Sequence, residues 1–453
     1  MKPSRIACVV LALGLGYSTA AFAQEQTWLK DRRYGEGIGI RTGDFELHPG
    51  IAGEFGYDTN YFLRSDRDPP GARPIDTLRL RITPSFSFGT ITQQRRESEG
   101  GGTEPPKVAF RANIAASYSE FIATKSANSD ALSKQRNIGA SGGLSLTILP
   151  QRPIGGDLYT DFLRSVQPSN LAEFNYNRFT ARFGGGIAWA PGGGMFDWRL
   201  GYQYSLTYFE DTRFRNLGNH THEINTRGRW RFLPRTAFMY DASLGFTRYD
   251  YATSSQLDSS PVRARVGING LVTSSFAFLG MVGWGASFYK GTPTQSPQQF
   301  DSIIAQAEFK WFITPNPGLD PAGVGLTLSS VAVGYSRDFF NSYLGDYYTR
   351  DRGYLSLATF FSQRVLLVVE GGVGAIEYPN IYGTNRVLEH TPFTTIMVDA
   401  SLFGEYRFSN TVGLNTTLRY TSNITDTFIG VPPNADYLEW KRFEAFIGLR
   451  WFM

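Results

Sequence analysis

Cysteine and long apolar runs are nearly absent from this chain. The one cysteine, Cys8, lies in the first apolar stretch, within a segment that we expect to be removed. The mature chain is therefore predicted to contain no disulfide and no thiolate chemistry. Beyond that first stretch, no segment reaches the roughly 18 uninterrupted apolar residues that a transmembrane helix requires. A helical membrane anchor is thus excluded from the expected architecture.

An excess of either charge is also missing. The chain has 44 basic and 40 acidic residues, and two of the basic ones, Lys2 and Arg5, precede the first apolar stretch. So small a net charge gives no indication of nucleic-acid binding, and no nucleic-acid partner is predicted.

The first residues have the three parts of a secretory signal. Lys2 and Arg5 come before the apolar run 6–16, and the small-residue triplet Ala21, Phe22, Ala23 follows. This pattern predicts a signal peptide over residues 1–23, cleaved near Ala23. We expect residues 24–44 to form a short periplasmic segment and residues 45–453 to form the folded domain.

Glycine and aromatic residues are abundant, and apolar and polar residues alternate through most of the chain. In the segment 78–88 the even positions are apolar or proline, and the odd positions are Arg, Thr or Ser. The segments 196–207 and 223–232 show the same alternation. A strand in lipid needs an apolar outer face and tolerates a polar inner one, so the pattern predicts an all-β transmembrane outer-membrane antiparallel β-barrel. A soluble propeller or sandwich array is the alternative.

Counting the alternating segments predicts about 18 strands, within a range of 16–18. They are expected near residues 45–57, 78–90, 108–120, 136–149, 154–165, 175–189, 195–209, 221–233, 236–248, 261–272, 275–288, 301–313, 324–336, 348–361, 364–377, 394–408, 411–421 and 438–453.

The connections between these segments alternate between short and long. Single-chain bacterial barrels have short periplasmic turns and longer outer loops, so both chain ends are expected on the periplasmic side. Two long connections, 91–107 and 314–323, fall on the periplasmic side against this rule. We interpret the first as a flexible loop, with a docking role for a partner as the alternative.

The last strand predicts an insertion signal for the barrel-insertion machinery. Its outward residues are apolar or aromatic: Phe443, Ile447, Leu449, Trp451 and Met453. The usual terminal residue is Phe, so Met453 departs from the pattern.

Residues 47–62 resemble the opening of a β-barrel porin family of Gram-negative outer membranes. The run Leu47-His48-Pro49-Gly50-Ile51 is followed by Phe55-Gly56-Tyr57-Asp58-Thr59-Asn60-Tyr61-Phe62, as an apolar-His-Pro segment leads into a Tyr-Asp-x-Asn-aromatic turn in that family. Many of its members, including myxobacterial ones, accompany exopolysaccharide export systems. The resemblance implies such a barrel, and similar large barrels also serve gliding-motility machines.

Candidate catalytic groups are scarce. A hydrolase dyad or triad would have to use one of four histidines, which are His48, His220, His222 and His390. His220 and His222 are two residues apart and could ligate a metal, but no third ligand is evident, and a solvated loop pair is the simpler interpretation. No phosphate-binding loop is present. We predict no catalytic, cofactor or metal site and no enzyme, with an outer-membrane protease or phospholipase as the minor alternative.

Eleven arginines occupy the alternate positions of the predicted strands that face inward, and they are predicted to line the pore. They are Arg79, Arg81, Arg111, Arg178, Arg182, Arg199, Arg227, Arg229, Arg231, Arg263 and Arg265. One interpretation is structural, because inward acids such as Asp157, Asp197 and Asp241 can pair with them. The other is functional, since opposed arginines create a field that favours anions. Both interpretations remain open at this stage.

The sequence therefore predicts a porin-like channel for hydrophilic solutes or a polysaccharide chain. The segment ahead of the first predicted strand is too short for the plug of an energised transporter, so passage would be passive or driven by periplasmic and inner-membrane partners. The alternative is a non-conducting barrel that anchors a cell-surface or gliding-motility complex through its loops and the segment 91–107.

Overall fold

A computed structural model describes most of the chain beyond its first 38 residues. The described ranges are 39–69, 73–91, 107–133, 137–150, 152–165, 177–191, 194–251, 256–291, 297–313, 329–361, 364–382, 388–429 and 436–453. The predicted signal peptide and most of the segment 24–44 lie outside them, so those two predictions are untested.

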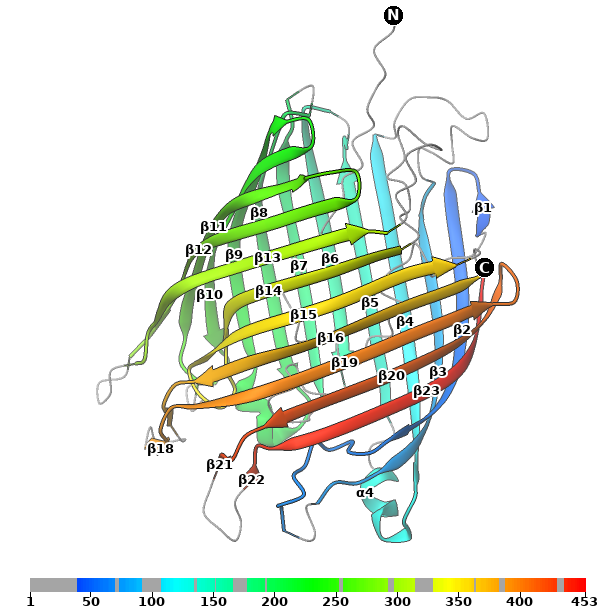
Figure 1. The fold of residues 1–453 in the computed structure, drawn as a ribbon, viewed down its shortest axis with the longest axis vertical. Helices are drawn as coiled ribbons and strands as arrows, with labels where there is room; N and C mark the ends of the chain where they lie inside the picture. Colours follow the sequence, from blue (N-terminus) through cyan, green and yellow to red (C-terminus); the bar gives the residue numbers. More distant parts are fainter. Residues whose placement is uncertain are drawn as a thin grey trace, which may run out of the picture.

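The described residues form a closed antiparallel barrel of eighteen long strands (Figure 1). These are β2 (Phe45–Asp58), β3 (Thr77–Thr90), β4 (Val108–Ala123), β5 (Asn137–Ile148), β6 (Ile154–Ser165), β7 (Arg178–Trp189), β8 (Phe196–Phe209), β9 (Asn219–Leu233), β10 (Thr236–Tyr249), β11 (Ser259–Leu271), β12 (Phe276–Tyr289), β13 (Phe300–Phe312), β14 (Ser329–Asn341), β15 (Tyr347–Phe361), β16 (Val365–Tyr378), β19 (Phe393–Arg407), β20 (Val412–Ile424) and β23 (Trp440–Phe452). Each pairs with the next along the chain, and β2 pairs with β23 to close the barrel, with Asp58 opposite Glu444.

Shorter elements lie at the two ends of the barrel. β1 (Ile40–Thr42) pairs antiparallel with the start of β2. The hairpins β17 (Ile381–Tyr382) with β18 (Leu388–His390) and β21 (Phe428–Ile429) with β22 (Asp436–Tyr437) lie at the other end (Figure 1). The helical turns there are η2 (Ser126–Asn128), α4 (Ser129–Ser133) and η3 (Thr212–Leu217). No helix among the described residues is long and apolar enough to cross a bilayer.

The predicted fold class and strand count are confirmed, and one strand is displaced. β14 was expected at 324–336 and lies at Ser329–Asn341. Alternation is weak in this part of the sequence, whereas pairing with β15 sets the register, with Arg337 opposite Asp351 and Asn341 opposite Tyr347. The connection from β14 to β15 is consequently only residues 342–346.

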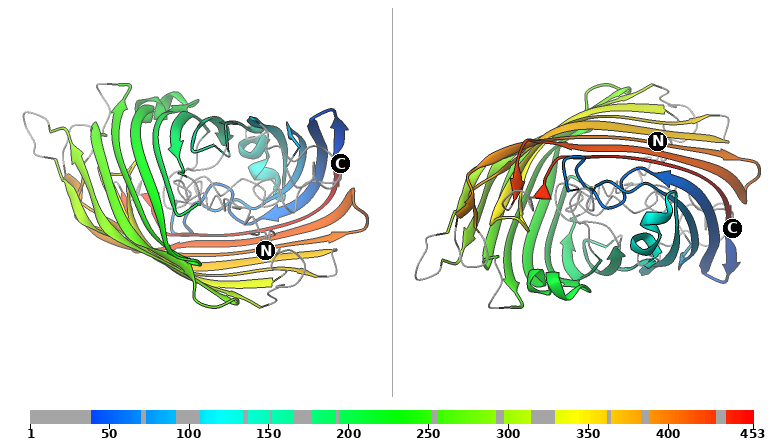
Figure 2. Two further views of the ribbon diagram at one scale, coloured as in Figure 1. Left: turned by 90° about the horizontal axis from the view of Figure 1, so that it is seen from above. Right: turned by 90° about the horizontal axis from the view of Figure 1, so that it is seen from below.

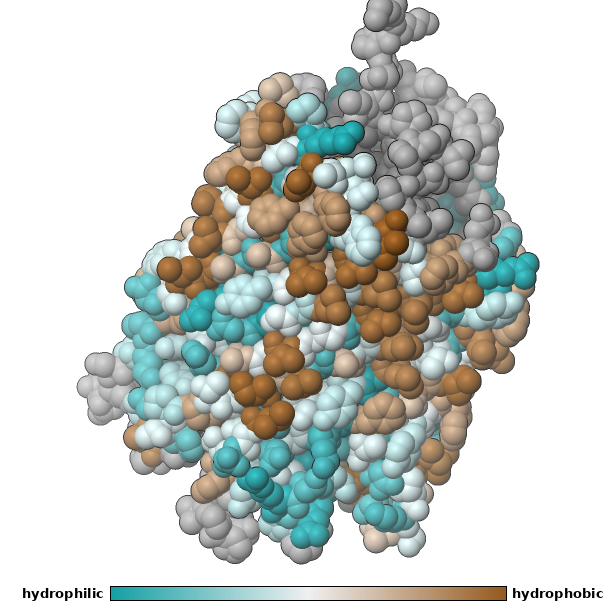
Figure 3. Space-filling view, viewed as in Figure 1, coloured by the Kyte–Doolittle hydropathy of each residue, from teal (hydrophilic) through white to brown (hydrophobic). Residues whose placement is uncertain are grey.

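The barrel wall has an apolar outer face and a polar inner face. On β3, Leu80 and Ile82 are exposed to the outside, whereas Arg79, Arg81 and Thr83 on the opposite face are buried. Figure 3 shows hydrophobic side chains gathered over the strands of one wall and hydrophilic ones at the end with the long connections. Since lipid accepts apolar side chains and rejects charges, the outer face is the membrane-facing surface.

The two rims differ as the loop lengths predict. β2 begins and β23 ends at the rim with short turns, and the long connections lie at the opposite rim (Figure 1). We call the end with the long connections the outer mouth. Viewed along its length, the barrel is flattened, and α4 lies within its outline (Figure 2). The outer mouth is thus partly covered by the chain's own connections.

Candidate functional site: the lumen and its outer mouth

All eleven predicted arginines lie on the strands that the alternation assigned to them. Their strands are β3, β4, β7, β8, β9 and β11, and each arginine alternates with apolar residues that are exposed on the outer face, such as Ile114 on β4 and Ile224 on β9. A role in lining a conducting pore remains a prediction for all eleven.

Seven of the eleven form ion pairs with carboxylates. The pairs are Arg79 with Asp58 and Glu444, Arg81 with Glu54, Arg182 with Asp161, Arg199 with Asp157, Arg229 with Asp197, Arg263 with Asp338, and Arg265 with Asp241. Of the others, Arg178 is buried, Arg231 is half-buried, and Arg111 and Arg227 are exposed on the inner face. Pairing with carboxylates is therefore extensive along the described inner face.

The densest charge cluster lies at the closing seam, on the inner faces of β2, β3, β19, β20 and β23. We call it the seam network, and it consists of Glu54, Asp58, Arg79, Arg81, Glu405, Asn415, Arg442, Glu444 and Arg450. Each member is less than one tenth exposed. Buried charges of this kind are stable only when paired and hydrogen-bonded.

Asp58 and Glu54 are the two acceptors at the centre of the seam network. Arg442 Nε donates to Asp58 Oδ1 at 3.0 Å, and Arg79 Nη1 donates to Asp58 Oδ2 at 3.2 Å. Glu54 accepts from Arg81 Nε and from Asn415 Nδ2, each at 2.9 Å. Side chains from both ends of the barrel sequence are thereby joined across the closing strand pair.

Aromatic rings complete the surroundings of Arg79. Its guanidinium carbon lies 5.2–5.5 Å from the ring centroids of Tyr61, Phe121 and Phe446, within the range of a cation–π interaction. Tyr61 belongs to the connection after β2, and burial raises the pKa of its hydroxyl. Tyr61 therefore remains neutral and contributes no charge to the cluster.

Sequence reasoning missed most of the seam network. Glu54, Asp58, Asn415, Arg442 and Arg450 were not among the predicted residues, whereas Arg79 and Arg81 were. A signal was available on the last strand, because Arg442 and Arg450 occupy the parity opposite to the outward insertion-signal residues.

A second group of charges lies on the inner faces of β6 to β9. We call it the lateral wall, and it consists of Asp157, Asp161, Arg182, Asp197, Arg199 and Arg229. Its pairs are close, with Arg182 Nε 2.8 Å from Asp161 Oδ2. Their side chains keep between 13% and 42% of their area exposed, so the lateral wall is accessible to water from the lumen.

At the outer mouth, opposite walls of the barrel touch. Tyr343, in the connection from β14 to β15, packs its ring edge-on against Phe209 at the end of β8, with ring centroids 5.7 Å apart. Arg178 Nη1 on β7 is 3.5 Å from the Tyr343 hydroxyl. Gln256 Nε2 donates to the Tyr343 backbone oxygen at 2.9 Å. These strands are far apart in the sheet order, so the contacts narrow the mouth.

A buried apolar cluster occupies the same end. Its members are Leu63, Leu344, Tyr348, Ile376, Tyr378, Ile381, Met397, Leu438 and Trp440. They come from strand ends and from several outer connections. The connections are also tied by polar contacts, because Asn60 Nδ2 donates to the backbone oxygens of Arg64 at 2.8 Å and Lys441 at 3.0 Å.

The histidine pair lies on the outer face of β9. His220 Nδ1 is 3.1 Å from Asp250 Oδ1, and His222 Nδ1 is 2.6 Å from the Tyr202 hydroxyl. Across the part of the chain that the structure describes, no three His, Asp or Glu side chains converge as a metal site would require.

Comparisons with known proteins identify similar shapes without assigning a family. No protein-family model matches the chain, and no curated protein matches it. Among solved structures, OpdK of Pseudomonas aeruginosa with vanillate is 10% identical, with a TM-score of 0.43 over 90% of this chain and 99% of that one. A BenF-like porin from Pseudomonas fluorescens Pf-5 is 10% identical, with a TM-score of 0.45 over 91% and 99%. The siderophore receptor PirA of Pseudomonas aeruginosa is 11% identical, with a TM-score of 0.40 over 91% and 81%. These values are too low to transfer a substrate or a mechanism.

Proposed function

We propose that this protein is an outer-membrane, porin-like channel that passes hydrophilic solutes. The observation that carries the proposal is the closed barrel whose outer face is apolar and whose inner face carries partly exposed ion pairs on the lateral wall. Barrels of 16 to 18 strands are wide enough to enclose an aqueous channel. A polar inner face suits solutes that cross the membrane with their hydration shell.

The solute class that fits best is anionic or polyhydroxylated. Arg111 and Arg227 are exposed on the inner face, and neither is paired with a carboxylate by any contact in the described part of the chain. Together with the paired arginines of the lateral wall, they offer donors to carboxylates or sugar hydroxyls. Export of a polysaccharide chain, which the resemblance of residues 47–62 implies, is the finer form of this proposal and would require partners that supply energy.

The second candidate is a barrel that does not conduct on its own and anchors a surface complex. The observation that favours it is the contact between opposite walls at the outer mouth, made by Tyr343 with Phe209, Arg178 and Gln256. The proposed docking segment, 91–107, lies almost wholly outside the described residues.

Planar-bilayer conductance of the refolded mature protein tests the channel proposal. The informative variant is Arg111→Gln with Arg227→Gln, because both side chains are exposed on the inner face. Arg248→Gln is the matched control, since Arg248 is exposed on β10 and has the outward parity. We expect a stable conductance whose anion-to-cation permeability ratio falls roughly twofold in the double variant and is unchanged in the control.

Three outcomes separate the candidates. Conductance with the expected change of selectivity supports the channel. If the folded wild-type barrel does not conduct and the folded Tyr343→Ala variant does, the channel is closed at its outer mouth. A folded barrel that conducts in neither form contradicts the channel proposal and favours the anchor.

A further inference from the structure

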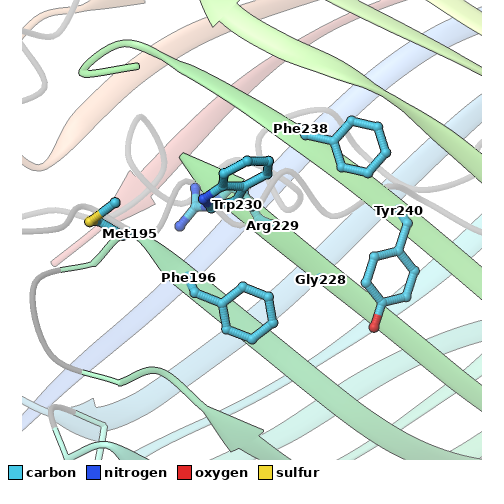
Figure 4. A pocket seen from close by; sticks show the side chains of 7 residues that line it. All are labelled: Met195, Phe196, Gly228, Arg229, Trp230, Phe238 and Tyr240. Atoms are coloured by element: carbon cyan, nitrogen blue, oxygen red, sulfur yellow. The ribbon is translucent and has the colours of Figure 1, made fainter. Parts of the chain in front are cut away.

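A cavity of about 620 Å³ opens on the outside of the barrel, away from the lumen (Figure 4). It is lined by the outward residues Phe196, Gly228, Trp230, Phe238 and Tyr240 and by Met195, and Arg229, whose side chain lies on the inner face, sits between Gly228 and Trp230 on β9. Trp230 and Phe238 are 52% and 39% exposed and lie directly opposite each other on β9 and β10. Because they belong to the membrane-facing side of the wall, the groove opens toward lipid.

The groove has a built floor and a fixed side. Its floor is Gly228, where any side chain would collide with the ring of Tyr240. The Tyr240 hydroxyl is 3.3 Å from the Thr226 hydroxyl, which accepts a hydrogen bond from Trp198 Nε1 at 3.0 Å. This chain of contacts holds the Tyr240 ring over the glycine and thereby fixes one side of the groove.

The groove lies beside the rim with the short turns. Phe196 is the first residue of β8, and β9 ends at Leu233, three residues after Trp230. At about 3.3 Å per strand residue, the groove begins within roughly 10 Å of the rim. Aromatic side chains gather at this depth in membrane barrels, where hydrocarbon meets headgroups. Arg235, in the turn itself, is exposed.

We propose that this groove binds one phospholipid of the adjoining leaflet, with an acyl chain against Phe196, Trp230 and Tyr240 and its phosphate near Arg235. The apolar lining suits a methylene chain, and the volume falls within the about 300–1,000 Å³ of small-ligand sites. A cation at the rim complements the headgroup phosphate. The groove is continuous with the membrane-facing wall, so bilayer lipid lies directly against it.

Native mass spectrometry of the detergent-purified mature protein, titrated with dioleoyl phosphatidylglycerol, tests the proposal. We expect one lipid to bind ahead of the rest. Trp230→Ala with Phe238→Ala should weaken this first binding step by about tenfold, and Arg235→Gln should weaken it by a smaller factor. Replacing the lipid with its phosphate-free diacylglycerol should remove the difference between wild type and Arg235→Gln.

Matched controls are available on the same rim. Trp311→Ala removes an outward tryptophan that is 43% exposed on β13, and Arg364→Gln removes an exposed arginine from another short turn. Both should bind the first lipid as wild type does. Folding of each variant is checked by the shift in gel mobility on heating. If the double variant misfolds, Tyr240→Phe, which removes only the hydroxyl contact, replaces it.

Two results would overturn the proposal. One is an equal weakening of the first lipid-binding step by the groove variants and the control variants. The other is a protein dimer that forms in place of the lipid complex and is lost in the Trp230 variant.

Discussion

The seam network and the lateral wall both pair arginine with carboxylate across neighbouring strands, but they differ in their access to water. At the seam, Arg79 and Arg442 are each 2% exposed and Asp58 is fully buried. On the lateral wall, Arg229 and Asp197 are 30% and 42% exposed. The same arginine–carboxylate pairing is therefore buried in one region and open to water in the other, depending on which side chains cover it.

The difference has a direct energetic meaning. Removing one partner of a buried pair leaves an uncompensated charge at low dielectric, which is strongly destabilising. A hydrated pair contributes little to stability, because water replaces the lost partner. We therefore regard the seam network as the part that holds the closing strands together, and the lateral wall as the part available to solutes.

The largest expected effect is at the seam. Arg442→Met should destabilise the barrel by about 3–5 kcal/mol, because Asp58 and Glu444 lose a shared counterion. Urea unfolding in lipid vesicles, followed by tryptophan fluorescence, measures the change. An unfolding midpoint equal to that of wild type would contradict the assigned role of the seam network.

The pairing within the seam is measured more sharply by a double-mutant cycle. Asp58→Asn and Arg442→Gln remove opposite sides of one buried contact, so their effects should be non-additive, with a coupling energy of about 0.5–3 kcal/mol. The same unfolding experiment on both single variants and the double variant yields this energy. Simple additivity would mean that the two side chains act independently.

At the outer mouth, Tyr343→Ala should raise the single-channel conductance roughly twofold, since it removes the ring that bridges β8 and the β14–β15 connection. Planar-bilayer recording measures this change. Tyr382→Ala is the control, because Tyr382 is a half-buried tyrosine on β17 at the same end of the barrel. A wild-type conductance in Tyr343→Ala would show that the narrowest point lies elsewhere.

The smallest stability effect is expected on the lateral wall. Arg229→Met should change the unfolding free energy by less than about 1 kcal/mol, because the pair with Asp197 is hydrated. In the same variant, the anion preference of the channel should fall. A loss of stability as large as that of Arg442→Met would remove the distinction between the two regions.

Much of the fold was predictable because a strand in lipid obeys a strict local rule. Alternation predicted eighteen strands and placed seventeen of them close to their observed bounds. The outward residues of the last strand, such as Phe443, Ile447 and Leu449, are exposed on the outer face as predicted. Their use as an insertion signal remains a prediction. The exception was β14, where alternation was too weak to set the bounds and pairing with β15 placed the strand.

The candidate site was only partly predictable. Parity placed arginines such as Arg199 and Arg229 on one face of their strands, but it treated Arg79 and Arg227 alike, although one is buried in a network and the other is exposed. Parity states which face a side chain occupies and contains no information about what lies opposite it.

The sequence by itself determined the barrel class, the strand count and the face on which each arginine lies, because each depends on residues that are close neighbours along the chain. Only the tertiary structure decided which charges are dehydrated at the seam, which remain hydrated on the lateral wall, and where Tyr343 meets Phe209. Those features depend on closure between β2 and β23 and on the flattening of the barrel, which bring together residues hundreds of positions apart. No local pattern encodes such distances, since they arise from the curvature of the whole sheet.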